Sequence, residues 1–216
     1  MTRQLKIDFI SDVACPWCAI ALHSLEEALR RAADVVQAQI HFLPFELNPD
    51  MAAGGANIDA HLGARYGGGT QRLAGMREMV RARGAEVGFT INQTGDSRLY
   101  NTFDAHRLLH WAGTVGHQRE LKHALFKANF TDNADVSDHT VLVQAAAAAG
   151  LDATAAREVL ASDRYGAEVR AIEQLWQNRG VHGVPGIIID EKWGISGSHP
   201  PEAFEEALRQ VAAEAP

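Results

Sequence analysis

The stretch Leu5–Cys18, with the sequence LKIDFISDVACPWC, decides the fold of this chain. Its first part, Leu5–Ile10, alternates apolar residues with polar or charged ones over the length of a β-strand. After Pro16, apolar residues recur at the spacing of one helix face, at Ile20, Leu22, Leu25 and Leu29. The stretch therefore predicts a strand that leads through a tight turn into a helix.

A second strand is predicted directly after this helix. Gln39–Phe45 is rich in aromatic and branched residues, and Pro44 should lie toward its end or at a sheet edge. Two strands joined by a helix favour parallel pairing with a right-handed connection. The N-terminal part is thus a β-α-β unit.

The middle of the chain, from about Asn48 to about Arg179, has a helical pattern almost throughout, broken by glycine-rich segments. The clearest helices are expected at 103–111, 118–127, 138–149 and 153–178, the last with a break near Asp163. After Gly180 the pattern changes to a β-hairpin, with strands at Val184–Asp190 and Trp193–Ile195. A final helix begins near Pro200 and Pro201. The predicted order is β-α-β, a helical block, then β-β-α.

Composition excludes several classes of protein. The chain has 216 residues, 46% hydrophobic and 22% charged, with a formal net charge of -7, which disfavours binding to nucleic acid or to anionic membranes. Charged residues interrupt the N-terminus, and no apolar run reaches membrane-spanning length, so we expect neither a signal peptide nor a membrane segment. Two cysteines cannot form a disulfide framework. We therefore expect a cytoplasmic protein.

The cysteine pair is the candidate catalytic site. Cys15 lies where the strand meets the helix, so unpaired backbone N–H groups and the positive end of the helix dipole favour its thiolate. Pro16 suits the first helical position because it lacks the N–H that would go unbonded. Cys18 is three residues on and lies on the same helix face. We expect Cys15, the more exposed, to attack and Cys18 to resolve the mixed disulfide, while Trp17 shapes the surface that a partner meets.

Two alternatives concern the residues around this pair. Asp12 could act on the proton balance of the cysteines, although a turn or cap role is favoured for it. A metal site could combine the cysteine pair with His106 and His110, which are spaced four apart among ten histidines. A second cysteine pair is missing, however, so no metal is expected. His106 and His110 are interpreted as ordinary histidines of the core edge or surface.

Three distant motifs together resemble a known family. They are the Cys15–Cys18 motif, the segment Gly180–Pro185 (GVHGVP) before a strand, and Ile195–Ser198 (ISGS), with a helical insertion after the first. In this order they resemble the DsbA family of thioredoxin-fold oxidoreductases, in its FrnE-like branch. The resemblance covers nearly the whole chain.

The resemblance implies an α/β fold of the thioredoxin type with a large inserted all-helical domain. The thioredoxin-like domain would comprise residues 1–50 and 175–216, and residues 51–174 would form the helical insertion that covers the cysteine site. Pro185 would be the cis-proline facing the cysteines, with Val184 offering its backbone to an extended substrate segment. The residues alone are also consistent with a simple strand-start proline at position 185.

The chain departs from some relatives in this family. Additional cysteines found in part of the branch are missing, which excludes an electron relay through a second pair. The expected lack of a signal peptide argues against a periplasmic oxidant. The related kappa glutathione transferases and hydroxychromene-carboxylate isomerases share the inserted-helix fold but typically have serine where Cys15 stands.

Three functions are therefore considered. The first is an enzyme that exchanges disulfides with protein or small thiol substrates and needs no cofactor beyond its own cysteine pair. The second is a glutathione-dependent transferase or isomerase, with glutathione as co-substrate. The third is a metal-binding or interaction module without turnover. Neither nucleic acid nor a membrane is an expected partner.

Overall fold

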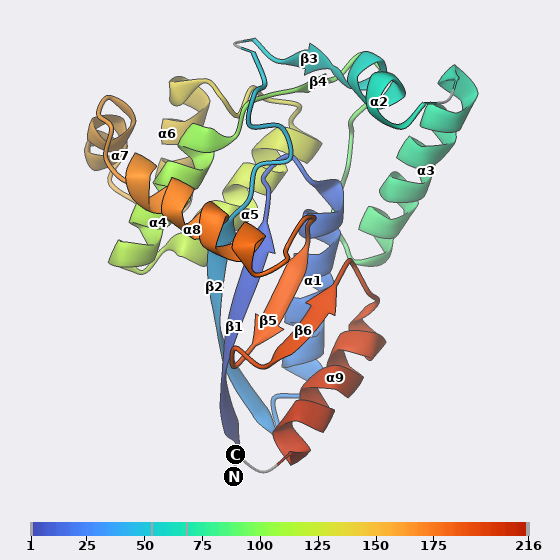
Figure 1. The fold of residues 1–216 in the computed structure, drawn as a ribbon, viewed down its shortest axis with the longest axis vertical. Helices are drawn as coiled ribbons and strands as arrows, with labels where there is room; N and C mark the ends of the chain where they lie inside the picture. Colours follow the sequence, from blue (N-terminus) through green and yellow to red (C-terminus); the bar gives the residue numbers. More distant parts are fainter. Residues whose placement is uncertain (1, 53, 68, 215–216) are drawn as a thin grey trace.

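The computed structural model describes residues 2–52, 54–67 and 69–214. Its centre is a four-stranded sheet with the order β2-β1-β5-β6 (Figure 1). The strands are β1 (Arg3–Ser11), β2 (Val36–Pro44), β5 (Gly186–Ile189) and β6 (Trp193–Ser196). β1 and β2 are parallel, whereas β5 is antiparallel to both β1 and β6. The predicted β-α-β unit and the C-terminal hairpin are confirmed.

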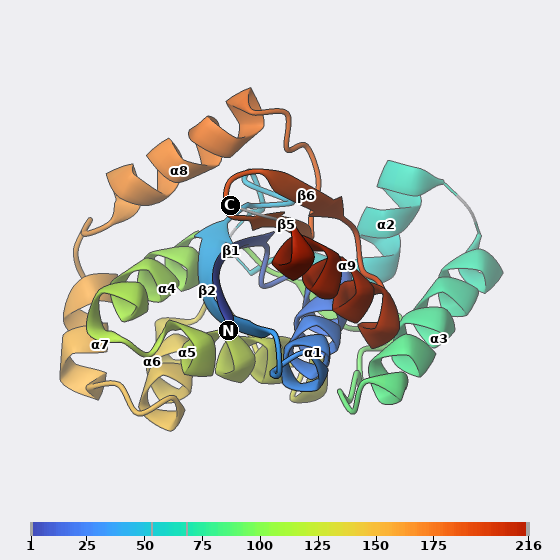
Figure 2. The ribbon, with the colours of Figure 1, turned by 90° about the horizontal axis from the view of Figure 1, so that it is seen from below.

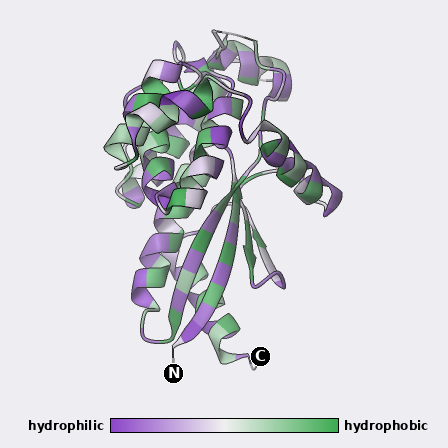
Figure 3. Ribbon diagram, turned by 90° about the vertical axis from the view of Figure 1, so that its left-hand side faces the viewer, coloured by the Kyte–Doolittle hydropathy of each residue, from purple (hydrophilic) through white to green (hydrophobic). Residues whose placement is uncertain are grey.

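β1 alternates between buried and exposed residues only in its first half. From Ile7 to Ser11 every residue is buried, because helices cover both faces of the sheet at this end (Figure 2). Hydrophobic and hydrophilic bands are visible along the strands in Figure 3. Pro44 is the last residue of β2, which is an edge strand, and the missing N–H of a proline is tolerated at such a position. β1 is thus followed by a fully buried turn that leads into the next helix.

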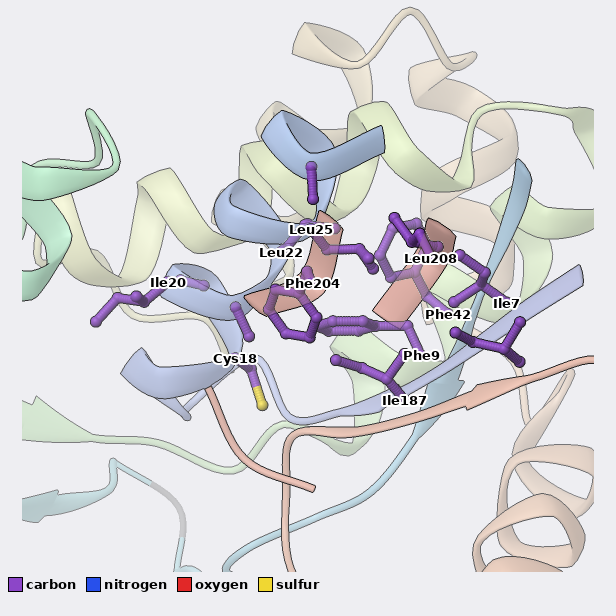
Figure 4. Close-up of a cluster of buried hydrophobic side chains, with 14 of the residues drawn as sticks. Ile7, Phe9, Cys18, Ile20, Leu22, Leu25, Phe42, Ile187, Phe204 and Leu208 are labelled. Atoms are coloured by element: carbon purple, nitrogen blue, oxygen red, sulfur yellow. The ribbon is translucent and has the colours of Figure 1, made fainter. Parts of the chain in front are cut away.

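Two helices pack together on one face of the sheet. They are α1 (Pro16–Arg31) and α9 (Pro201–Ala213), which contact each other (Figure 2). Between them and the sheet lies a cluster of buried side chains (Figure 4), including Phe9, Phe42, Leu25, Ile187 and Phe204. Phe9 and Phe42 meet edge to face with ring centroids 5.8 Å apart. Cys18 belongs to the same cluster, so the core packing holds the first turn of α1 in place.

The remaining helices lie between β2 and β5 in the sequence. They are α2 (Ile58–Tyr66), α3 (Thr70–Glu86), α4 (Phe103–Val115), α5 (Gln118–Phe126), the π-helix η1 (Lys127–Thr131), α6 (His139–Ala148), α7 (Ala153–Leu160) and α8 (Gly166–Asn178). Helices α4 to α7 enclose a second buried cluster that includes Leu108, Leu121, Leu142 and Val159. α2 and α3 form a separate arm that contacts α1 through α3 (Figure 1).

The expectation of helix almost throughout this block was incomplete. A two-stranded antiparallel ladder joins β3 (Ala56–Asn57) to β4 (Arg98–Leu99), and residues 89–97 contain no helix. Each of these strands has two residues, which is too short for any periodic pattern to be read from sequence. The ladder ties the arm of α2 and α3 back to the start of α4.

The expected domain limits can be compared with the helices. The second expected domain boundary, between residues 174 and 175, falls inside α8 rather than between two elements. α8 contacts both α4 and β2, so it joins the helical block to the sheet.

In the part of the chain that the structure describes, no helix is long and apolar enough to cross a membrane.

Candidate active site

Cys15 is the N-cap residue of α1. Its backbone is extended (φ -96°, ψ 110°), and its carbonyl accepts the N–H of Cys18 at 3.0 Å and that of Ala19 at 3.4 Å. Its own N–H donates to the carbonyl of Asp12 at 3.2 Å, which closes the turn after β1. Pro16 occupies the first helical position. The Cys15 sulfur therefore lies beside the free N–H groups at the start of a 16-residue helix.

Val184 approaches the cysteines from the other end of the sequence. The Cys15 Sγ lies 3.8 Å from the Val184 carbonyl oxygen, 169 residues away in the chain. The Val184–Pro185 peptide bond is cis. Gly186, the next residue, begins β5 and pairs with Ile10 of β1, so the sheet register sets this approach. The structure thus brings Cys15 and Val184 together, with Cys18 one turn further along α1.

Cys18 is the deeper cysteine. Its exposed fraction is 0%, against 4% for Cys15, and both are free thiols. Burial raises the pKa of Cys18 well above its usual value, and a hydrogen bond with Cys15 and the charge of Cys15 raise it further. The charge of Lys122 and the backbone of Asp12 act in the opposite direction. The Cys18 thiolate is therefore the costly species at this site.

Asp12 is a buried carboxylate that organises the turn. Its Oδ1 accepts the N–H of Ala14 at 3.1 Å, and its Oδ2 accepts the N–H of Leu47 at 2.7 Å. His106 Nε2 lies 3.4 Å from Oδ1, with both side chains almost fully buried. Burial raises the pKa of Asp12, but the hydrogen bond and charge of His106, with the two N–H groups, outweigh it and hold this pKa below its usual value. The favoured turn role of Asp12 agrees with these bonds, and His106 is a core residue rather than a surface one.

Two further polar side chains reach this site from the helical block. Asn129 in η1 donates from Nδ2 to the Val13 carbonyl at 3.0 Å and so fixes the turn from outside. Lys122 in α5 is fully buried, and the charges of Cys18, Asp12 and Cys15 act on its pKa. Sequence reasoning missed both. A signal existed for Lys122, which precedes Leu125 and Phe126 by three and four residues and so lies on the apolar face of its helix.

A cavity of about 290 Å³ opens beside Cys15. Cys15, Pro16, Trp17 and Val184 form one side of it. Its other walls come mainly from the arm of α2 and α3 and are apolar, with Ile58, Leu62, Leu73, Met76 and Val80 among them. Arg65 and His61 also line it. This Cys15 cavity has the size and apolar character of a site for a small ligand or a side chain.

The histidines proposed for a metal site have other partners. His106 faces Asp12, whereas the ring of His110 lies 5.2 Å from that of Tyr165. Among residues 2–52, 54–67 and 69–214, no group of three or more His, Cys, Asp or Glu side chains is placed to hold a metal ion.

Glu46, beside Leu47, is a buried carboxylate whose titration should be visible in stability. Its side chain is 2% exposed and pairs with Arg170, which also binds Glu173 at 2.9 Å. Burial and the charge of Glu173 raise the pKa of Glu46 to about 7, although Arg170 opposes them. A raised folded pKa favours the protonated folded form, so stability falls as pH rises from the unfolded pKa to the folded one.

We expect the difference in unfolding free energy between wild type and Glu46→Gln to fall as pH rises, by up to roughly 1.4 kcal/mol per pH unit. The fall should run from the ordinary glutamate pKa up to about 7. Urea denaturation across this range measures the difference. The control is Glu27→Gln, because Arg30 and Arg31 lower the pKa of Glu27. Its difference should therefore change only below the ordinary glutamate pKa, and it should stay level across the range tested for Glu46. A flat difference for Glu46→Gln would contradict the raised pKa.

Comparison with known proteins agrees with this architecture. The family model of the DSBA-like thioredoxin domain matches residues 6–209, so the chain belongs to this family. A structure described as a probable DsbA oxidoreductase from Streptomyces coelicolor is 34% identical, covers 98% of this chain and 92% of its own, and superposes with a TM-score of 0.90.

More distant structures share the fold alone. A 2-hydroxychromene-2-carboxylate isomerase is 14% identical over 95% of both chains, with a TM-score of 0.68. The cytosolic disulfide reductase DsbM from Pseudomonas aeruginosa is 13% identical over 95% of this chain and 98% of its own, with a TM-score of 0.61. The expected thioredoxin-like fold and the DsbA family are thereby confirmed.

Proposed function

We propose that this DsbA-family protein is a thiol-disulfide oxidoreductase that works through Cys15 and Cys18. The observation that carries the proposal is the placement of two free thiols on the first turn of α1, next to the Val184 carbonyl. Cys15 lines a cavity, whereas Cys18 has no exposed surface. A substrate sulfur therefore has access to Cys15 and not to Cys18.

The reaction follows from this difference in access. In reduction, the Cys15 thiolate attacks a substrate disulfide, the new Cys15–substrate bond forms, and one substrate thiolate leaves. The Cys18 thiol then loses its proton and attacks the Cys15 sulfur, which releases the second substrate thiolate and leaves a Cys15–Cys18 disulfide. The two electrons pass from the cysteine pair to the substrate. Oxidation of a substrate is the same sequence in reverse.

Two features support a role for the surroundings in holding the substrate. The Val184 carbonyl beside Cys15 can accept a backbone N–H from an extended segment that presents its sulfur. The Cys15 cavity can take an apolar group next to that sulfur, with Trp17 and Pro16 at its edge. Val184 and Pro185 are therefore proposed as substrate-binding residues, and no metal or organic cofactor takes part.

A glutathione-dependent transferase or isomerase is the second candidate. The Cys15 cavity favours it, because its size suits a small thiol and Arg65 and His61 supply polar groups at its walls. In that function Cys15 would contact the glutathione sulfur and Cys18 would not be needed.

The FrnE-like branch and the cytoplasmic location also stay proposals. The cytoplasmic location is supported by a chain that has no cysteine beyond this pair.

The deciding experiment is a redox titration of the wild-type protein in glutathione buffers. Alkylation and mass spectrometry count the free thiols at each ratio, and zinc and bound glutathione are assayed in the same samples. We expect one two-electron transition, with a midpoint of about -270 mV for a reductant and about -120 mV for an oxidant. Two thiols that stay reduced in every buffer, or a stable adduct with glutathione, would reject the proposal and favour the second candidate.

A further inference from the structure

Lys122 is a buried amine that the proposed reaction leaves without a role. Its side chain has no exposed surface, and its neighbours on the buried face of α5 are Leu121, Leu125 and Phe126. The Nζ atom lies 4.7 Å from the centroid of the Phe126 ring. Within the described residues this Nζ meets no hydrogen-bond partner. A buried ammonium in this state is costly, since its bonds to water are lost and no anion is hydrogen-bonded to it in their place.

The groups that act on Lys122 point to the cysteines. Phe126, whose ring faces this Nζ, belongs to the same buried cluster as Cys15 and Cys18. Cys18, Asp12 and Cys15 each exert a charge effect on Lys122. His106 and His110 line a small space with it near the end of β2. The carboxylate of Asp12 is already bonded to Ala14, Leu47 and His106. The sulfurs are the groups whose charge changes during thiol-disulfide exchange.

A purely structural role explains this lysine poorly. Lysines normally cover apolar surface with their methylene groups and keep the ammonium in water, whereas here the ammonium itself is enclosed. Contact with the Phe126 ring offsets part of the cost, but an apolar side chain of similar length would fill the same space without it. The position therefore calls for a negative charge that is present only in part of a reaction cycle.

We propose that Lys122 is the buried counter-charge that stabilises the Cys18 thiolate when the mixed disulfide is resolved. The inference rests on the proposed function, because it needs a mixed disulfide on Cys15. The Cys18 proton is lost, the Cys18 sulfur bonds to the Cys15 sulfur, and the substrate sulfur leaves with the electron pair of the broken bond. Lys122 is a positioning residue, since it acts through the charge of Cys18 and need not touch the substrate.

The titration of the two groups supports this role. Burial lowers the pKa of Lys122 to about 8, while Cys18, Asp12 and Cys15 raise it. Burial raises the pKa of Cys18, and the Lys122 charge lowers it. Two such groups titrate as a coupled pair. When the pair holds a single proton, that proton can be on the amine or on the sulfur, and the net charge of the pair is zero in both cases. The rate of resolution should then rise with pH and level off once this single-proton state dominates.

The test uses the full chain and an aromatic disulfide that releases a coloured thiol. Reduced protein releases one equivalent when Cys15 attacks and a second when Cys18 resolves the adduct. For wild type, we expect the second rate to level off above about pH 8. For Lys122→Met, it should fall about tenfold at neutral pH and continue to rise about tenfold per pH unit. An unchanged second rate and plateau in Lys122→Met would overturn the inference.

A matched control lies five residues further along the chain. Lys127 is exposed and pairs with Asp132 at 2.6 Å, so Lys127→Met should leave both release steps as in wild type. The two steps also separate the two proposals. If wild type fails at the first release, the proposed function is rejected and the inference falls with it. If only the response of the second step to Lys122→Met is missing, the inference alone fails.

A measurement on wild type covers the case in which Lys122→Met does not fold. The Lys122 side chain can be titrated by NMR in the dithiol form and in the Cys15–Cys18 disulfide form. Because the disulfide has no thiolate, we expect a lower pKa for Lys122 in the oxidised protein. Equal values in the two forms would overturn the inference, since a lysine with only a packing role is indifferent to the charge on Cys18.

Discussion

Cys15→Ser is expected to abolish disulfide exchange while leaving the fold intact. A hydroxyl in place of the thiol is not ionised at neutral pH and cannot form the mixed disulfide. Cys18 cannot substitute for it, because its side chain has no exposed surface. We therefore expect the rate of exchange with a small disulfide substrate to fall by at least roughly three orders of magnitude. The consumption of a chromogenic disulfide under pseudo-first-order conditions measures this rate.

The folded state of Cys15→Ser provides the control. Cys15 makes no side-chain cap bond to α1, so its replacement by serine removes no hydrogen bond of the helix start. Circular dichroism and the thermal midpoint should stay close to those of wild type. A variant that is folded and still exchanges disulfides at the wild-type rate would reject Cys15 as the attacking residue.

Cys18→Ser is expected to have the opposite phenotype. Cys15 can still attack, but no second thiol is close enough to resolve the adduct, so mixed disulfides accumulate. With an equimolar disulfide substrate, we expect most of the variant to carry the adduct, against a small fraction of wild type. Intact-protein mass spectrometry under non-reducing conditions gives both fractions directly.

This variant also separates the two candidate functions. A glutathione-dependent enzyme would keep its turnover in Cys18→Ser, because Cys15 alone contacts the glutathione sulfur. Full turnover without a trapped adduct would therefore favour that function over disulfide exchange. The double variant Cys15→Ser, Cys18→Ser should form no adduct at all, which shows that the trapped species depends on Cys15.

The sequence was sufficient for the parts of the fold that repeat a pattern. β1, α1, β2 and the hairpin of β5 and β6 were predicted because their apolar residues follow the period of a strand or a helix. The break between α7 and α8 was also predicted, near Asp163. The two-residue strands β3 and β4 were not, since their pairing depends on the path of the whole arm rather than on local sequence.

The candidate site divides in the same way. Cys15 and Cys18 stand in one short motif, so local geometry was enough to propose their roles. His106 and Asn129 contact the turn from helices about a hundred residues away. The charges of Asp12 and the cysteines act on Lys122 from a similar separation in sequence. All three placements depend on how those helices pack against the sheet. A lone polar residue on an apolar helix face was the available signal, and it does not specify a partner.

Membership of both cysteines in the main hydrophobic cluster has a thermodynamic consequence. Folding and disulfide formation belong to one thermodynamic cycle. The reduction potential of the pair, converted to a free energy by nFΔE, therefore equals the difference in folding stability between the dithiol and disulfide forms plus a constant for the unfolded chain. Packing around Phe9, Phe204 and the first turn of α1 that favours one form more than the other therefore tunes the potential from a distance. The same core side chains that stabilise the sheet therefore also contribute to the reduction potential of the cysteine pair.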